Sequence, residues 1–343
     1  MLFPLSVADR LAVNTINSNQ DFKMTLSYDP EFSKAAAEVL LAMAGSPSPA
    51  VNDVQARRVD ITARYAAIFE TLPDTSHVAQ DVYRIPSYDG QPISVYRFST
   101  KNPTSTSAGP AILHTHGGGM IQGSVDLFKK VLSLQVQDTG VQVFSVDYRL
   151  APEKPFPTPV EDCYMGLTWL YEHADEFAVD RSRIATMGES AGGNLAAAIT
   201  LMARDRGLSP PLAKQILIYP MLDDRTTVPN PALEPLALWT TNDNITGWTA
   251  LLGNDIGKDR VSPYAAPARV TSMVGLPPTY IDVGELDIFR DEDITYAARI
   301  AAANISLEFH VYPGLPHAFD VYARDIEVTK RAIAHRYKAV LAI

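Results

Sequence analysis

The residues Gly188-Glu189-Ser190-Ala191-Gly192 fit Gly-x-Ser-x-Gly, a pattern that places a serine on a sharp turn between a strand and a helix. The run before it, residues 183–187, is short and mainly apolar, as expected of a buried strand, and the alanine-rich run 191–206 favours a helix. Residues two before and two after the serine crowd each other in so tight a turn, and glycine avoids the clash. Because the pattern also occurs by chance in many chains, its context has to decide whether Ser190 is a nucleophile.

Strand and helix patterns alternate on both sides of this turn. Strands are expected at residues 93–98, 111–116, 141–147, 215–219, 279–283 and 307–312. Helices are expected at residues 160–177, 291–303 and 328–341. Such alternation predicts an α/β fold, in which a mostly parallel sheet is covered by helices on both faces.

Two stretches of the chain interrupt the alternation. Residues 1–75 have a helical pattern, with one apolar stripe running from an Asp29 N-cap to Gly45, a Pro- and Ser-rich linker at 46–52 and a second helix at 54–72. Residues 221–275 are rich in proline and contain two tryptophans. We therefore expect a core in two parts, 76–220 and 276–343, with 1–75 and 221–275 as accessory, partly helical pieces.

Composition and charge exclude several classes of protein. Hydrophobic residues make up 46% of the 343 and charged residues 20%, which is ordinary for a globular protein. The net charge of -10, without a basic run, argues against nucleic acid or an anionic membrane as partner. Cys163 is the single cysteine, so an intramolecular disulfide and a thiolate zinc cluster are excluded, and a reducing compartment fits.

The start of the chain and its hydropathy bear on its location. The apolar run from Met1 to Ala8 is followed at once by Asp9 and Arg10, which makes it too short for a signal peptide. No run is long and apolar enough to span a membrane. We therefore expect a cytoplasmic protein without stable membrane insertion.

Ser190 needs a base to take its proton and an acid to hold that base. With a serine on this kind of turn, the acid and then the histidine follow later in the chain, on loops after strand ends. Asp287 follows the strand expected at 279–283, and His317 follows the next one, so we predict Asp287 as acid and His317 as base. Rival acids close by are better explained as loop charges, a strand residue or acids at a helix N-terminus: Asp282, Glu285, Asp291 and Asp293.

A glycine run supplies the remaining catalytic element, an oxyanion hole. In His116-Gly117-Gly118-Gly119, glycines after a strand let backbone N–H groups converge on a negative oxygen, and the amide of Ala191 adds a further donor. The run lacks the residues of a phosphate-binding loop and the glycine spacing of a dinucleotide site. His114 and His116 share one side of a strand, but no third metal ligand is in sight, so no metal is predicted, and His116 is expected to orient the glycine loop.

Together these motifs resemble the hormone-sensitive-lipase-like branch of the α/β-hydrolases, which includes many microbial carboxylesterases. The resemblance spans about residues 80 to 320 and rests on residues 116–119, on 147–157, on 188–193, on Gly284 with Asp287 and Arg290-Asp291, and on His317. It implies an eight-stranded sheet with a cap made from the N-terminal helices and an insertion. It also implies Ser190, His317 and Asp287 as catalytic triad, the amides of Gly118, Gly119 and Ala191 as oxyanion donors, and no cofactor. Relatives are often dimers, so a homodimer is allowed by analogy.

The sequence departs from this family at three positions near the site. Met120 stands where a large aromatic usually follows the glycines, Ala318 replaces a glycine after the histidine, and Ile288 replaces a proline after the acid. None of these changes removes a catalytic atom, but Met120 is expected to border the substrate pocket. The candidates for an apolar pocket lining, each of which fits the core equally well, are Met120, Ile121, Met221, Trp239, Trp248 and Phe289.

The expected reaction is hydrolysis of small to medium, fairly apolar carboxylic esters through an acyl-enzyme. The same residues also fit an amidase, a lactonase or a biosynthetic tailoring hydrolase, and the sequence does not separate these. A receptor without catalysis is a third hypothesis, because plant gibberellin receptors resemble this family while lacking a working triad. The presence of His317 argues against it.

Overall fold

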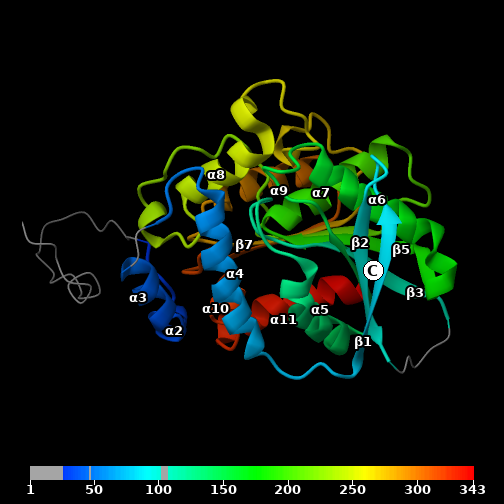
Figure 1. Ribbon diagram of the computed structural model, residues 1–343, viewed down its shortest axis with the longest axis horizontal. Coiled ribbons are helices and arrows are strands. Elements are labelled where there is room, and N and C mark those ends of the chain that lie inside the picture. Colours follow the sequence, from blue (N-terminus) through cyan, green and yellow to red (C-terminus); the bar gives the residue numbers. More distant parts are fainter. Residues whose placement is uncertain (1–25, 46–47, 102–106) are drawn as a thin grey trace, which may run out of the picture.

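A central sheet of eight strands organises the computed structural model, which describes residues 26–45, 48–101 and 107–343 (Figure 1). The strand order is β1-β2-β4-β3-β5-β6-β7-β8. The bounds are β1 Val78–Pro86, β2 Pro92–Thr100, β3 Gly109–Thr115, β4 Gln142–Asp147, β5 Val179–Glu189, β6 Lys214–Ile218, β7 Thr279–Gly284 and β8 Leu307–Tyr312. Strand β2 pairs antiparallel with β1 and β4, and the other pairs are parallel, which confirms the mostly parallel sheet.

Helices cover both faces of the sheet, as predicted. One face carries α5 (Val125–Thr139) and α11 (Glu327–Leu341), which pack against each other, and the other face carries α6 (Thr158–Glu172), α7 (Ala191–Asp205) and α9 (Arg290–Ala302) (Figure 1). The remaining α-helices are α2 (Pro30–Ala35), α3 (Ala37–Gly45), α4 (Val54–Glu70), α8 (Thr241–Leu252) and α10 (Phe319–Tyr322). Short 3-10 helices lie at Ala174–Phe177, Glu234–Leu236, Gly253–Asp255 and Pro267–Arg269.

Some elements differ from the sequence expectations. The helix expected between Asp29 and Gly45 is two helices that meet at Ala36. Strand β1 and helix α5 were not predicted, and β1 gave little signal because most of its side chains are exposed or only half-buried. Helix α5 has recognisable ends, since the Ser124 hydroxyl caps it and Gly140 ends it at a φ of +69°. The expectation based on Met1 to Ala8 lies outside the described residues, as does the start of the linker expected at 46–52.

The parallel strands bring four loops to one edge of the sheet. Strands β3, β5, β7 and β8 run in the same direction, so their carboxyl ends meet there. The glycine run follows β3, Ser190 follows β5, Asp287 follows β7, and His317 follows β8. The fold therefore brings together residues that are as much as about 200 positions apart in the chain, such as His116 and His317.

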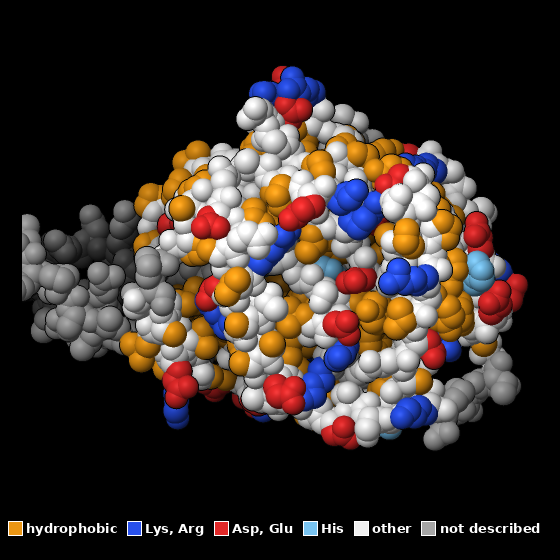
Figure 2. All heavy atoms as spheres, viewed as in Figure 1, with side chains coloured by type: hydrophobic (Ala, Val, Ile, Leu, Met, Phe, Trp, Pro, Cys, Tyr) orange, Lys and Arg blue, Asp and Glu red, His pale blue; other side chains and the backbone are white. Residues whose placement is uncertain are grey.

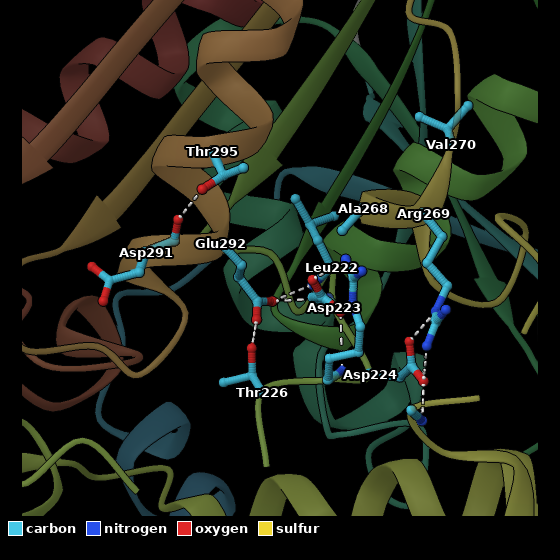
Figure 3. A network of polar contacts seen from close by, with 12 residues as sticks. Leu222, Asp223, Asp224, Thr226, Ala268, Arg269, Val270, Asp291, Glu292 and Thr295 are labelled. Atoms are coloured by element: carbon cyan, nitrogen blue, oxygen red, sulfur yellow. Dashed lines mark hydrogen bonds and ion pairs between the residues drawn. The ribbon is translucent and has the colours of Figure 1, made fainter. Parts of the chain in front are cut away.

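The segment between β6 and β7 is bound to the core by a buried carboxylate at the start of α9 (Figure 3). Glu292 accepts hydrogen bonds from the backbone N–H groups of Leu222 (2.6 Å) and Asp223 (3.1 Å) and from the Thr226 hydroxyl. A few residues along, Asp224 binds the Arg269 guanidinium at 2.5 and 2.9 Å. These bonds fix the beginning and the end of the segment that carries α8.

Helices α4 and α8 lie side by side on one side of the molecule (Figure 1) and are joined by an ion pair between Arg57 and Asp243. On the face that carries them, acidic and basic side chains are interspersed rather than gathered by sign (Figure 2). Among the described residues, no helix has both the length and the apolar character needed to cross a membrane.

Candidate active site

Ser190 occupies the turn between β5 and α7 in the strained conformation expected of it. Its φ is +57°, and its backbone is held by hydrogen bonds from its N–H to Ile218 O (2.9 Å) and from Met221 N to its carbonyl oxygen (3.0 Å). A Cβ added to Gly188 would lie 2.4 Å from the carbonyl carbon of Gly192, and one added to Gly192 would lie 1.9 Å from a backbone oxygen of β3. The crowding argument for the two glycines is therefore confirmed.

Ser190, His317 and Asp287 form one chain of hydrogen bonds. His317 Nε2 lies 2.9 Å from Ser190 Oγ, and His317 Nδ1 lies 2.6 Å from Asp287 Oδ2. The other carboxylate oxygen of Asp287 accepts the backbone N–H of Phe289 at 2.9 Å. The Phe289 ring stands edge-on to the imidazole, with centroids 5.1 Å apart. All three polar side chains are buried, and their order is the one that a nucleophile, a base and an acid require.

The rival acids have other partners. Asp282 binds the buried Arg336 guanidinium at 2.6 and 2.9 Å, Glu285 accepts the N–H of Gly314 at 2.9 Å, and Asp291 is exposed beside Arg290. Asp293 lies in the first turn of α9, as expected of an acid at a helix N-terminus, but it is fully buried rather than solvated, and its carboxyl oxygens have no hydrogen-bond partner in the described part of the chain. Burial, reinforced by the nearby carboxylates, raises the pKa of Asp293 well above its usual value.

The glycine run lies directly beside Ser190. A Cβ on Gly117 would be 3.6 Å from the Ser190 Cβ. Gly118 and Gly119 have φ values of +126° and +60°, and in the described structure no acceptor takes the N–H of either residue. Ala191 begins α7 immediately after the serine, so its amide lies at the positive end of that helix. The geometry suits donors aimed at an oxygen above Ser190.

His116 holds the glycine run from below, as predicted. Its Nδ1 lies 2.8 Å from the Gly117 carbonyl oxygen, its ring stacks on Tyr148 at 4.3 Å, and the Tyr148 hydroxyl donates to the His116 carbonyl oxygen at 2.8 Å. Burial lowers the pKa of His116 to about 4, so the ring is neutral at pH 7 and Nδ1 donates to the carbonyl. His114 instead contacts Ser145 Oγ (2.8 Å) and Glu189 (3.0 Å). Among the described residues, no group of three or more ligand side chains is placed to hold a metal ion.

Comparison with known proteins places the chain in a family. A family model described as the alpha/beta hydrolase fold matches residues 112–321. The chain belongs to the α/β-hydrolase family. This α/β-hydrolase is 34% identical over 263 residues to the carboxylic ester hydrolase LipN of Mycobacterium tuberculosis, covering 75% of this chain and 69% of LipN. It is also 34% identical to the carboxylesterase NlhH of that species, over 68% of this chain and 75% of NlhH.

Solved structures agree with this assignment. A bacterial heroin esterase superposes with a TM-score of 0.81 at 34% identity, covering 92% of this chain and 97% of the esterase. A hyperthermophilic esterase from the archaeon Pyrobaculum calidifontis superposes with a TM-score of 0.78 at 28% identity, covering 92% and 99%. The resemblance to hormone-sensitive-lipase-like α/β-hydrolases and the eight-stranded sheet that it implied are confirmed.

The cavity of this α/β-hydrolase at Ser190 is small and adjoins a larger chamber. The small cavity, of about 40 Å³, is lined by Ile61, Tyr65, Gly117, Gly118, Gly119, Gln122, Phe128, Glu189, Ser190, Tyr219, Trp239, His317, Ala318 and Val321. The chamber, of about 360 Å³, lies between the end of α4, helix α5 and the segment 320–325. The two spaces share the lining residues Phe128, Glu189, Tyr219 and Val321, so they adjoin next to Ser190, the residue after Glu189.

The expected apolar lining differs from this one. Of the six candidates, Trp239 lines the cavity, and its indole lies against Gly119. The other five are buried side chains that line neither space: Met120, Ile121, Met221, Trp248 and Phe289. Met120 was expected to border the pocket, but its side chain is packed in the core instead. The backbone at this residue has a φ of +65°.

Sequence reasoning missed the lining residues from α4, α5 and the loop after His317. Ile61 and Tyr65 come from a helix more than 100 positions before Ser190, and nothing local marks them as pocket residues. Tyr219 could have been found, because it directly follows β6, the strand that neighbours β5. Its ring packs edge-on against His317 with centroids 4.9 Å apart.

Proposed function

We propose that the protein is a serine carboxylesterase that uses Ser190, His317 and Asp287. The single observation that carries the proposal is the continuous bond chain of 2.6 and 2.9 Å from Asp287 through His317 to Ser190, which ends beside the glycine run. The names of the relatives, which are esterases and carboxylic ester hydrolases, support an ester as substrate. An ester carbonyl in the small cavity would meet both the nucleophile and the amide donors.

The reaction follows from these positions. Ser190 Oγ attacks the ester carbonyl carbon while His317 Nε2 takes the hydroxyl proton. The carbonyl oxygen becomes an oxyanion and accepts hydrogen bonds from the amides of Gly118, Gly119 and Ala191. When the tetrahedral intermediate collapses, the C–O bond to the alcohol breaks and His317 returns its proton to the leaving oxygen. Water activated by His317 then releases the acid from Ser190, and no step needs a cofactor.

Asp287 keeps His317 in the productive tautomer. Its carboxylate accepts the Nδ1 proton at 2.6 Å, so Nε2 is left with a lone pair toward Ser190. The same carboxylate stabilises the imidazolium that forms during attack. Its own orientation is fixed by the Phe289 N–H.

The two adjoining spaces favour small to medium esters. The chamber is lined in part by the apolar side chains Ile68, Phe69, Leu72, Phe128, Val131 and Val321. Its volume of about 360 Å³ suits a short alkyl or aryl group rather than a long lipid chain. We infer that this chamber receives the larger apolar half of the ester.

The test compares an ester with its amide. Wild type should hydrolyse p-nitrophenyl butyrate, and the Ser190→Ala and His317→Ala variants should lose this activity while keeping the wild-type melting temperature. The p-nitroanilide of the same acid should react far more slowly. Preferred cleavage of the anilide would assign an amidase, and an active Ser190→Ala variant would contradict the proposal.

Three further expectations stay proposals. The division into a core at 76–220 and 276–343, with a cap built from 1–75 and 221–275, is supported by the cavity contacts of α4 and Trp239. A cytoplasmic location rests on the single cysteine, and a homodimer rests on analogy with relatives.

A further inference from the structure

The glycine loop, residues 116–123, has backbone conformations that a chain rarely adopts unaided. The φ angle is +126° at Gly118, +60° at Gly119 and +65° at Met120. Met120 is the costly member, because a residue with a Cβ is disfavoured at positive φ. Such conformations persist where surrounding groups hold them. The shape of the proposed oxyanion hole therefore depends on what binds this loop.

One holder is the core segment that follows β4. The Tyr148 hydroxyl donates to the His116 carbonyl oxygen at 2.8 Å, and the Ala151 N–H donates to the Met120 carbonyl oxygen at 3.0 Å. These bonds fix the loop at its first residue and at its strained residue. Both donors lie in the segment directly after β4.

A second holder comes from outside the sheet layers, from helix α4. Arg58 Nε donates to the Ile121 carbonyl oxygen at 2.6 Å, and Arg58 Nη2 donates to the Ala151 carbonyl oxygen at 3.0 Å. The guanidinium of Arg58 thus links Ile121, the residue after Met120, to Ala151, whose N–H binds the Met120 carbonyl oxygen. Arginine suits this task because its planar group directs several N–H donors at fixed angles.

Glu153 fixes the orientation of that guanidinium. Its two carboxylate oxygens accept from Arg58 Nη1 and Nη2, both at 2.7 Å. The side-chain hydrogen bond from Arg58 lowers the pKa of Glu153 to about 2, so the pair stays charged throughout the neutral range. A bidentate pair of this kind holds the planar group in one orientation.

The preceding residue of α4 binds the other accessory helix. Adjacent residues of a helix point in different directions, and Arg57 turns toward α8, where its Nε donates to Asp243 at 2.8 Å. Arg57 is also buried, with 2% of its surface exposed. Helix α8 in turn packs on the glycine loop, since a Cβ on Gly247 would lie 2.7 Å from the Gly119 carbonyl oxygen. Helix α4 therefore holds the loop directly through Arg58 and indirectly through α8.

We propose that Arg58 is a positioning residue for the oxyanion hole, and that α4 couples the wall of the substrate cavity to the alignment of the oxyanion donors. The same helix contributes Ile61 and Tyr65 to the cavity at Ser190, within two turns of Arg58. A displacement of α4 moves the cavity wall and releases the Ile121 carbonyl together. The inference rests on the proposed esterase function.

The test removes the Arg58 guanidinium and compares a matched arginine. Arg181 makes the same kinds of bond, with Nε on the Tyr171 carbonyl (2.7 Å) and both Nη atoms on Asp175, but it lies at the start of β5, at the opposite end of that strand from Ser190. Arg58→Ala should lower kcat by roughly 10- to 100-fold with KM changed less than about threefold, because donor alignment matters in the transition state. Arg181→Ala should leave both constants unchanged.

A second readout separates positioning from general damage to the fold. A trifluoromethyl ketone forms a tetrahedral adduct with the serine and places an oxyanion in the hole, whereas a product alcohol does not. In Arg58→Ala, Ki for the ketone should rise by about the factor by which kcat/KM falls, with Ki for the alcohol unchanged. Arg58→Lys, which retains the charge but not the fork of donors, should show a smaller loss and also decides the matter if the alanine variant does not fold.

The outcomes that overturn the inference are specific. They are wild-type kcat in Arg58→Ala or in Arg58→Lys, a loss confined to KM, an unchanged Ki for the ketone, or an equal loss in Arg181→Ala. A wild-type protein that hydrolyses no ester would instead contradict the proposed function itself.

Discussion

Two regions of the molecule are built in different ways. One is the edge of the sheet that carries Ser190, Asp287 and His317, and the other is the accessory side formed by α4 and α8. At the sheet edge, each proposed catalytic side chain lies in the connection that follows a parallel strand, so the arrangement of the strands fixes where it lies. On the accessory side, position depends on side-chain contacts such as Arg57 with Asp243. The order of the strands in the sheet thus positions the proposed catalytic residues, whereas side-chain packing between distant segments shapes the cavity.

The largest effect expected at the sheet edge is that of Asp287→Asn. An amide at this position holds the wrong tautomer of His317, so kcat should fall by about 10⁴-fold with little change in KM. Steady-state kinetics on p-nitrophenyl butyrate measure this. Asp291→Asn, a change at an exposed carboxylate on the same loop and helix, is the control and should be neutral. Intact kcat in Asp287→Asn would show that another group holds the base.

On the accessory side, filling the chamber should change selectivity rather than chemistry. Val131→Trp places a large ring in the chamber from the rigid helix α5. Activity on a p-nitrophenyl octanoate should fall by roughly tenfold relative to the acetate, because the longer acyl group loses its space. Lys129→Trp, at an exposed position of the same helix, should leave the ratio unchanged. An unchanged ratio in Val131→Trp would mean that the acyl group lies elsewhere.

A substitution at Met120 tests whether this residue belongs to the core or to the substrate cavity. Its side chain is buried in the core and lines neither the cavity nor the chamber. Met120→Trp should therefore reduce the free energy of unfolding by about 1–3 kcal/mol through overpacking. Urea denaturation gives this value, and an acyl-length series on the folded fraction should give the wild-type preference. A shifted preference without loss of stability would place the side chain in the substrate's path.

A pH-dependent effect concerns the buried acid Asp293 at the start of α9. The pKa of Asp293 is raised in the folded state by burial and by Glu292, Asp287 and Asp282, so folding retains a proton that the unfolded chain releases above about pH 4. The raised pKa of Asp293 therefore contributes its full stabilisation below about pH 4, and this stabilisation is lost as the pH rises toward the folded-state pKa. Asp293→Asn should gain stability relative to wild type between pH 5 and 8, by at most about 1.4 kcal/mol per pH unit. Urea denaturation at both pH values tests this, and an equal difference at both would contradict the assigned pKa shift.

The same division explains how much the sequence could predict. Ser190, Asp287 and His317 follow strands whose apolar runs are visible in the sequence, and the hydrogen bonds among their side chains fit the expected order along the chain. Strand β1 went unrecognised because its side chains are mostly exposed or half-buried. The role proposed for Arg58 could not be predicted either, because nothing near it in the sequence indicates that the fold brings Ile121 and Glu153 into contact with it.

The pocket could not be predicted for a related reason. Side chains such as Met120, Met221 and Trp248 are as suitable for a core as for a ligand site, and only the path of the backbone decides between the two. The burial of Asp293 could not be foreseen either, because an acid in the first turn of a helix is normally solvated. Here Asp293 is fully buried although Asp291 in the same turn is exposed, so position along the helix does not reveal which acid is solvated.

The central claim, that Ser190 is the nucleophile, is tested most directly by covalent labelling. A fluorophosphonate probe reacts with a serine that is activated by a base, and the oxyanion hole binds the phosphoryl oxygen of the probe. Peptide mapping by mass spectrometry after labelling should find one adduct per chain, on Ser190, with none in Ser190→Ala. An unlabelled wild type, or an adduct that persists on another residue in Ser190→Ala, would contradict the account.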